Sequence, residues 1–332
     1  MGIRAVVCER HGTPESVSIG EIPSRPLEEG TARISVEYAA VNFPDVLVVA
    51  DDYQVSVPTP FVPGSEFAGV ITEISLPGDG FAIGDRVMGT GLYGAFAEEV
   101  VIPTRSLSRI PDGVTMRLAA AAGVAYRTAY HSLRSVARVR QGDPVVVLGA
   151  GGGVGLAAVA LAAALGAEVV AVASSPEKLD AAREHGARWL VNHRDVELRT
   201  ALKDALTAGA AAVIDPVGGK LSEPALRSLR RGGRFVTVGF ASGEIPRIPL
   251  NLVLVKGIQI LGFQFGDIAP DEFARNEQEL RALLTDGRVV PHVGAEFPLE
   301  EVPQALRAVA DGQAIGKILI RVDGATSHPL IE

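Results

Sequence analysis

The sequence has few of the residues that bind metals or cross-link a chain. Cys8 is the only cysteine among 332 residues. A single cysteine permits neither an intramolecular disulfide nor a four-thiolate zinc site within one chain. The six histidines show no H-x-x-H or H-E-x-x-H spacing, so each is better interpreted as a structural or solvated side chain. We therefore expect no bound metal.

Positive charge is also scarce. The chain has 31 lysines and arginines against 39 aspartates and glutamates, which gives a formal net charge of −8 at pH 7. Nucleic-acid binding needs a basic excess to neutralise phosphates, and none is present. A nucleic-acid partner is therefore not expected, and the ligand should be a small molecule.

No segment is typical of a membrane span or a secretory signal. The uncharged run 148–167 is long enough to raise the question, but its first eight residues contain five glycines, which oppose a spanning helix. The first ten residues return to charge at Glu9, too early for a signal peptide. We expect a soluble, cytoplasmic protein with no membrane partner.

The chain is long enough for two domains, because one hydrophobic core usually stops growing at roughly 250 to 300 residues. Up to about Arg117, short β-rich runs alternate with glycine and proline. From about Ala119, alanine-rich helices alternate with apolar strands, as in parallel βαβ units. This pattern predicts an α/β protein with a β-rich domain over 1–120, completed by 266–332, and a doubly wound parallel sheet over 121–265.

A glycine-rich turn lies between an apolar strand and an alanine-rich helix. Gly151, Gly153 and Gly155 satisfy G-x-G-x-G, whereas the fuller dinucleotide fingerprint takes Ala150, Gly152 and Gly155, with alanine in place of the first glycine. Glycine lets the backbone approach a pyrophosphate, and the N–H groups at the start of the helix bind its oxygens. The predicted cofactor contacts here are Ala150, Gly151, Gly152, Gly153, Val154 and Gly155.

The next strand predicts a preference for NADP(H). In NAD-binding proteins an acidic residue about 20 positions on accepts hydrogen bonds from the ribose. Here the strand is followed by Ser174 and Ser175, with Lys178 close behind. Hydroxyl groups and a cation suit a 2′-phosphate. Glu177 is expected in the first turn of a helix, facing water, and His193 and Arg194, after the following strand, are further candidates for the phosphate site.

Together these features resemble the medium-chain dehydrogenase/reductase superfamily, in particular its zinc-free quinone oxidoreductase family. The resemblance covers nearly the whole chain. Besides the glycine turn it rests on VNFPDVL (41–47), PFVPGSEFAGVI (60–71), IGDRV (83–87), AYRTAYHSL (125–133), DPVGG (215–219) and IGKILI (315–320).

The resemblance implies a GroES-like catalytic domain and a Rossmann nucleotide-binding domain, with the nicotinamide in the cleft between them. It places Asn42 and Ser65 where zinc-dependent relatives have ligands, so metal-assisted chemistry is not expected. It also implies a homodimer formed through the apolar segment 245–266. The residues that it places near the nicotinamide are Asn42, Thr128, Gly239, Phe240, Phe263 and Lys317.

Without a metal, the substrate must accept hydride when only hydrogen bonds polarise it, which favours a quinone or an alkene conjugated with a carbonyl. The resulting oxyanion needs a proton. Tyr53 stands where related enoyl reductases have a tyrosine and is our candidate donor, alongside water, although Asp51 and Asp52 replace the glycine usual before it. Asp45 is expected to fix the loop of Asn42, and Glu66 to be a buried, paired carboxylate.

Two alternatives stay open. The first is an enoyl-CoA or acryloyl-CoA reductase on the same scaffold, for which arginines within 132–140 would bind the CoA phosphates. The second is a non-catalytic protein that binds NADPH or senses redox state.

Overall fold

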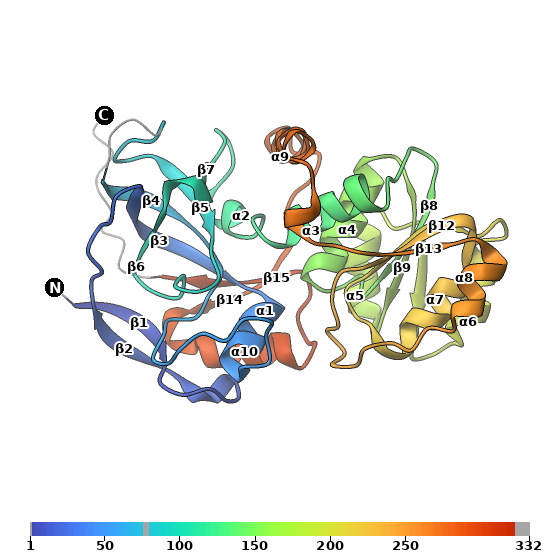
Figure 1. Ribbon diagram of the computed structural model, residues 1–332, viewed down its shortest axis with the longest axis horizontal. Helices are drawn as coiled ribbons and strands as arrows, with labels where there is room; N and C mark the ends of the chain where they lie inside the picture. Colours follow the sequence, from blue (N-terminus) through green and yellow to red (C-terminus); the bar gives the residue numbers. More distant parts are fainter. Residues whose placement is uncertain (1, 76–79, 323–332) are drawn as a thin grey trace. The chain divides into compact units, whose positions relative to one another are not determined.

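The computed structural model describes residues 2–75 and 80–322. The chain forms two compact units (Figure 1). Unit 1 comprises Met1–Val124 and Val293–Glu332, and unit 2 comprises Ala125–His292. Each unit has its own sheet and its own hydrophobic core.

Unit 1 is the β-rich unit. Its larger sheet has the order β14-β15-β3-β4-β5-β7, with β6 paired to β3, and β1 and β2 form a separate antiparallel pair. The strands are β1 (Gly2–Cys8), β2 (Val17–Pro23), β3 (Thr31–Val41), β4 (Glu66–Ile74), β5 (Arg86–Thr90), β6 (Glu99–Pro103), β7 (Leu107–Arg109), β14 (Val293–Pro298) and β15 (Lys317–Arg321). The α-helices are α1 (Phe43–Ala50), α2 (Met116–Ala120) and α10 (Val302–Ala310), and short 3₁₀ turns are η1 (Pro14–Ser16), η2 (Thr104–Ser106) and η6 (Leu299–Glu301).

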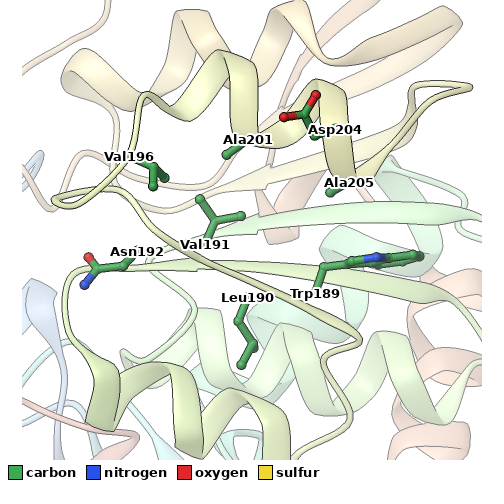
Figure 2. A pocket seen from close by; sticks show the side chains of 8 residues that line it. All are labelled: Trp189, Leu190, Val191, Asn192, Val196, Ala201, Asp204 and Ala205. Carbon is green, nitrogen blue, oxygen red and sulfur yellow. The ribbon is translucent and has the colours of Figure 1, made fainter.

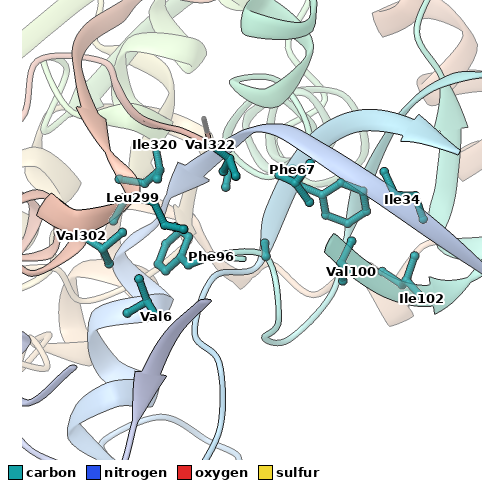
Figure 3. Close-up of a cluster of buried hydrophobic side chains, with 14 of the residues drawn as sticks. Val6, Ile34, Phe67, Phe96, Val100, Ile102, Leu299, Val302, Ile320 and Val322 are labelled. Carbon is teal, nitrogen blue, oxygen red and sulfur yellow. The ribbon is translucent and has the colours of Figure 1, made fainter. Parts of the chain in front are cut away.

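The core of unit 1 joins distant parts of the sequence. Over Thr31–Val36, the first six residues of β3, buried and partly exposed residues alternate, as expected for a strand with one face on the core. Figure 3 shows side chains from the first strand, the middle of the unit and the C-terminal segment gathered in one cluster, including Val6, Phe67 and Ile320. The last strand, β15, pairs antiparallel with β3, with Ile318 opposite Val41. The expected return of the chain to the first unit is therefore observed.

Unit 2 contains a six-stranded parallel sheet in the order β10-β9-β8-β11-β12-β13. The strands are β8 (Pro144–Leu148), β9 (Glu168–Ala173), β10 (Trp189–Asn192), β11 (Ala210–Asp215), β12 (Leu229–Thr237) and β13 (Gln259–Gly262). The helices are α3 (Ala125–His131), α4 (Gly153–Ala164), α5 (Pro176–Glu184), α6 (Leu198–Ala205), α7 (Ser222–Arg227), α8 (Leu250–Lys256) and α9 (Pro270–Thr285), with a π-helix η3 (Ser132–Val136) and 3₁₀ turns η4 (Gly219–Leu221) and η5 (Phe265–Asp267).

The strand order of unit 2 confirms the predicted doubly wound sheet. The chain runs outward from β8 to β10 on one side and from β11 to β13 on the other, so the order reverses between β8 and β11. Ligands of such sheets bind at the carboxyl ends of the strands where this reversal occurs. Val145, Val146 and Val147 of β8 are fully buried, as expected for a central strand covered on both faces.

The predicted boundary at residue 266 is wrong. Residues 266–292 belong to unit 2, and the chain returns to unit 1 only at Val293. The physical reason is the docking of α9 on α3. Arg127 contacts Glu277 with Nε–Oε1 and Nε–Oε2 distances of 3.0 and 2.9 Å, and the Tyr130 hydroxyl donates to Glu279 at 2.6 Å.

Candidate functional site

The glycine turn connects β8 to α4 at the reversal point of the sheet. Gly149 has a φ of +60°, which favours glycine, and Gly152 is the N-cap of α4. A Cβ on Gly155 would lie 2.0 Å from the carbonyl oxygen of Gly149 and 3.0 Å from the Cα of Ala150. Only glycine therefore lets the first turn of α4 sit this close to the loop.

The start of α4 has the chemistry of an anion site. The first N–H groups of a helix have no carbonyl partner within it, and they carry a partial positive charge. No acidic residue occupies the first turn of α4, which begins Gly153, Val154, Gly155. A Cβ on Gly152 would meet its nearest atom, the oxygen of Gly149, only at 3.6 Å. A methyl group at Gly152 would therefore make only an ordinary contact with the described chain.

Lys178 lies directly over this loop. A Cβ on Gly151 would come within 2.4 Å of the Lys178 side chain, and the Lys178 ammonium is 3.5 Å from the hydroxyl of Ser174. The hydroxyl of Ser175 caps α5 by accepting from the N–H of Lys178. Glu177, next in sequence, is exposed in the first turn of α5, where its hydrogen bond with Ser175 lowers its pKa. The expected position of Glu177, in the first turn of a helix and facing water, is therefore observed.

His193 and Arg194 belong to the same cationic cluster. Both follow β10, which pairs with β9, the strand that precedes Ser174 and Ser175. Burial and then the charge of Arg194 lower the pKa of Lys178. Burial, Arg194 and Lys178 together lower the pKa of His193. Like charges that lower each other's pKa lie close together, so Lys178 and Arg194 form one site of positive potential, with His193 beside them largely uncharged at neutral pH.

The turn after β11 is part of the site, although its residue pattern was not used to predict it. The buried carboxylate of Asp215 accepts from the N–H groups of Val217 and Gly218, both at 2.8 Å, and from the Ser222 hydroxyl at 2.6 Å. This holds Val217 so close to the glycine loop that a Cβ on Gly149 would be 2.6 Å from its Cγ2. DPVGG was recognised only as a family motif, although an aspartate before a glycine pair is a turn signal in itself.

The remaining predicted contacts of unit 2 lie at the ends of neighbouring strands or on α3. Gly239 and Phe240 follow β12, and a Cβ on Gly218 would be 2.9 Å from the ring of Phe240. Phe263 follows β13 and packs edge-on against Phe265, with ring centroids 4.8 Å apart. Thr128 is buried on α3, the helix that packs on α4.

In unit 1 the structure brings Asn42 and Lys317 together around Glu66. The Lys317 ammonium donates to the amide oxygen of Asn42 at 2.5 Å and to the Glu66 carboxylate at 3.1 Å. The Asn42 amide nitrogen donates to the same Glu66 oxygen at 3.0 Å. Exposed fractions of 6, 2 and 1 % for Asn42, Lys317 and Glu66 mark a nearly dry cluster. The expectation of a buried, paired Glu66 is met, and Lys317 is not a surface lysine.

Asp45 fixes the backbone of Asn42, as expected. Its Oδ2 accepts from the Asn42 N–H at 2.7 Å and completes a capping box at the start of α1. Burial raises the pKa of Asp45 to about 7 despite opposing hydrogen bonds from Asn42 and Ser65. Within the described chain, its Oδ1 has no hydrogen-bond partner. The carboxyl group is therefore readily protonated near neutral pH.

Tyr53 stands apart from this polar cluster. It follows the end of α1, where Asp51 adopts a left-handed conformation with a φ of +61°. The ring is half-buried and packs against the apolar core of unit 1. The structure thus gives Tyr53 a packing role, and its role as a proton donor stays a prediction.

A separate groove of about 390 Å³ lies between β10 and α6 (Figure 2). Val191 points toward α6, and Leu190 points to the other side of the strand. The groove shares no lining residue with the glycine loop or the cationic cluster, so we do not assign it to the candidate site. Its lining residues are Trp189, Leu190, Val191, Asn192, Val196, Ala201, Asp204 and Ala205.

Residues 2–75 and 80–322 lack two further features. No group of three or more histidine, cysteine, aspartate or glutamate side chains is placed to hold a metal ion there. No helix in that part of the chain has both the length and the apolar character needed to cross a membrane.

Two protein-family models match the chain. The model for the alcohol dehydrogenase GroES-like domain matches residues 28–112, in unit 1, and the model for zinc-binding dehydrogenases matches residues 153–283, in unit 2. The expected combination of a GroES-like and a Rossmann-like domain is confirmed.

Individual proteins match over nearly the full chain. Quinone oxidoreductase-like protein 2 of Bos taurus is 36% identical over 322 residues, which cover 96% of this chain and 92% of the relative. The polyketide synthase GfsB of Streptomyces halstedii is 36% identical over 303 residues, which cover 90% of this chain and 5% of the synthase. The structure of mycobacterial Rv1454c complexed with NADPH has a TM-score of 0.89 and 26% identity, covering 96% of this chain and 99% of that one.

Proposed function

The chain belongs to the medium-chain dehydrogenase/reductase superfamily and to its quinone oxidoreductase type, and on that premise we propose that it transfers hydride from NADPH to a quinone or an enone. Membership makes the chain an oxidoreductase, so the alternative of a non-catalytic nucleotide-binding or redox-sensing protein is not retained. The proposal concerns the cofactor, the acceptor and the residues that serve them.

The cationic cluster beside the glycine loop is the observation that supports NADPH as the cofactor. We place the diphosphate at the uncrowded Gly152 of the fingerprint loop, and Lys178, His193 and Arg194 then lie where the adenosine ribose of the nucleotide would be. A 2′-phosphate there would be attracted by Lys178 and Arg194 and hydrogen-bonded by Ser174 and Ser175. The mycobacterial relative solved with NADPH supports the same cofactor.

NADPH, when bound, supplies the hydride. Addition of hydride to a quinone or a conjugated enone leaves an oxyanion that needs a proton. Lys317 and Glu66 hold the Asn42 amide by hydrogen bonds. We assign Asn42, with Thr128, Gly239, Phe240 and Phe263 of unit 2, to the nicotinamide and its substrate. Tyr53 is the proposed proton donor.

Stopped-flow oxidation of NADPH tests the reaction. We expect turnover with 1,4-benzoquinone, a naphthoquinone or a simple enone, and slower turnover with crotonyl-CoA. Binding of NADPH without oxidation by any of these acceptors would contradict the proposed reaction.

Lys178→Glu tests the cofactor site, because it places a carboxylate where we place the 2′-phosphate. Removing one charge-assisted hydrogen bond and adding repulsion should cost about 2 to 3 kcal/mol, or roughly 30-fold to more than 100-fold in Kd for NADPH, with NADH changed much less. Lys203→Glu on α6 makes the same charge change at an exposed position and is the matched control. Equal losses for NADPH and NADH in Lys178→Glu would refute this account of selectivity.

Reduction of an enoyl thioester is the second candidate, supported by the similarity to a polyketide synthase. The structure weakens one part of it. Arg134, within the arginine segment expected to bind CoA phosphates, is already paired with Glu279 at 3.2 Å. Arg138 and Arg140 remain exposed. Faster NADPH oxidation with crotonyl-CoA than with any quinone would favour this candidate.

We also propose a homodimer formed through the edge of the sheet of unit 2. β13 is an edge strand of that sheet, and the neighbouring segment exposes large apolar side chains. Leu250 and Leu254 on α8 are 75 and 83 % exposed, and Ile245 is 72 % exposed. An unpaired strand edge beside exposed leucines favours association with a second copy by strand pairing across a two-fold axis.

A further inference from the structure

Lys317 has no hydrogen left to offer a ligand. An ammonium group has three N–H donors. Here they are matched by three acceptors within unit 1: the Asn42 amide oxygen at 2.5 Å, the Glu66 carboxylate at 3.1 Å and the Val41 carbonyl at 3.2 Å. A lysine whose three donors are all engaged, and which is 2 % exposed, is poorly suited to contact a cofactor directly.

The same contacts fix which way the Asn42 amide faces. Its oxygen accepts from an ammonium, and its nitrogen donates to the Glu66 carboxylate at 3.0 Å, with the Ser65 hydroxyl and the Ala40 carbonyl both at 3.3 Å. Turning the amide over would set its nitrogen against the ammonium and its oxygen against the carboxylate. Both contacts would become repulsive in a dry site, where such errors are costly.

Three segments far apart in sequence build this arrangement. Lys317 opens β15, Glu66 opens β4, and Asn42 links β3 to α1. The pairing of β15 with β3 places Ile318 opposite Val41, which brings Lys317 to Asn42. Glu66 is anchored independently, because its Oε1 accepts from the N–H of Val124 at 2.8 Å. The charge pair is therefore set by the sheet itself.

We propose that Lys317 and Glu66 are positioning residues that lock the Asn42 amide in one orientation for the reaction, and that Lys317 does not bind the cofactor. This inference rests on the proposed function for its link to turnover. The orientation of the amide, however, can be observed without any cofactor. Lys317 is thereby moved out of the set of cofactor contacts that the sequence predicted.

A double-variant cycle tests the proposal. The variants are Lys317→Met, Glu66→Gln and the two combined. Each single variant leaves one buried charge unpaired and should lower the urea midpoint, whereas the combined variant removes both charges and should recover most of that loss. In the combined variant neither of the two charges that contact the Asn42 amide remains to dictate its orientation, so kcat should stay at least tenfold below wild type. The Kd for NADPH, measured by fluorescence titration, should stay within threefold throughout.

Selective ¹⁵N labelling of asparagine reads the amide directly. The chain has only four asparagines, Asn42, Asn192, Asn251 and Asn276, so four side-chain amide pairs are expected, and Asn42→Ser identifies the relevant pair. In the ligand-free protein, Glu66→Gln and the combined variant should shift the Asn42 resonances and leave the other three in place. Glu99→Gln, which breaks the 2.6 Å pair with Arg33 elsewhere in unit 1, is the matched control and should shift none of them.

The outcomes separate the two levels of inference. Full recovery of kcat together with stability in the combined variant would show a purely structural pair and overturn the proposal. A tenfold or larger rise in the NADPH Kd of Lys317→Met would restore Lys317 as a cofactor contact and also overturn it. Unchanged Asn42 resonances would refute the orientation claim whatever the activity. If the wild-type protein oxidises NADPH with none of the acceptors while the resonances shift as expected, the proposed function fails and the orientation claim stands.

Discussion

Replacing Gly155 with alanine tests whether the glycine loop is built as the structure has it. A Cβ there would lie 2.0 Å from the Gly149 oxygen, where an ordinary contact begins at 3.4 Å. The helix or the loop must therefore move by more than 1 Å, and both colliding groups are backbone. Overpacking of this kind costs about 3 kcal/mol, offset by about 0.5 to 1 kcal/mol because alanine is the better helix former.

The expected net loss in Gly155→Ala is therefore about 2 to 2.5 kcal/mol. For a unit of this size, that corresponds to a fall in Tm of roughly 4 to 10 °C. Binding of NADPH should weaken as well, because the displaced N–H groups no longer converge on the diphosphate. Thermal unfolding of the ligand-free protein gives the first quantity, and fluorescence titration with NADPH gives the second.

Gly152→Ala is the matched control, made three residues earlier in the same loop. Its Cβ would meet the nearest atom at 3.6 Å, and its φ of −85° suits any residue. The cost to stability should stay below about 1 kcal/mol, the penalty for alanine at an N-cap. NADPH affinity should nevertheless fall tenfold or more, because the added methyl occupies the space that we assign to the diphosphate.

Two results would refute this reasoning, each at a different step. Wild-type Tm in Gly155→Ala would mean that α4 does not approach the loop as closely as the structure shows. Wild-type NADPH affinity in Gly152→Ala, with the fold intact, would mean that the diphosphate lies elsewhere. Either result would also remove the geometric basis for placing the 2′-phosphate beside Lys178.

Three further predictions follow from unit 1 and from the sheet edge. Burial raises the pKa of Asp45 to about 7, so the folded state retains a proton that the unfolded state releases near pH 4. This group therefore lowers the free energy of unfolding by up to about 4 kcal/mol as pH rises from 4 to 7. Asp45→Asn should remove that pH dependence in urea titrations, and an unchanged pH dependence would contradict the raised pKa. Tyr53→Phe should lower kcat with an enone about 100-fold if Tyr53 is the proton donor, whereas Tyr93→Phe should not, and equal rates would leave Tyr53 as a packing residue. Leu254→Lys should yield monomers in light scattering, whereas Ile83→Lys, at an exposed site of unit 1, should not. A monomeric wild-type protein would refute the proposed dimer.

Local patterns were enough to predict the nucleotide loop. An apolar strand, a cluster of glycines and an alanine-rich helix follow one another within about 20 residues, so the interactions that shape the loop come from neighbours in sequence. The same holds for Glu177, which a serine–proline pair places in the first turn of α5. The cationic cluster was predicted only as separate candidates, because His193 and Arg194 join Lys178 through the pairing of β10 with β9.

The docking of α9 on α3 could not be predicted from such local patterns. The segment from 266 onward follows the last strand of the parallel sheet, so a return to the first domain was the simpler expectation. What decides its place is a set of paired charges on two helices 150 positions apart, such as Arg127 with Glu277. From the sequence alone, a helix with acidic residues on one face is interpreted as facing water, because the sequence does not show which basic residues contact it.

The cluster around Asn42 shows why a residue type alone does not assign a role. From the sequence, Lys317 was expected near the nicotinamide, an interpretation that leaves its charge facing a ligand. A buried ammonium must be paired and fully hydrogen-bonded to be tolerated, and its partner Glu66 is 251 positions away. Once that pairing is known, the three N–H donors of Lys317 are all engaged, and a contact with the cofactor is excluded. The residue that we assign to the reaction is then Asn42, whose amide Lys317 and Glu66 hold. The role that we propose for Lys317 therefore depends on the sheet of unit 1, in which β15 pairs with β3 and β3 pairs with β4.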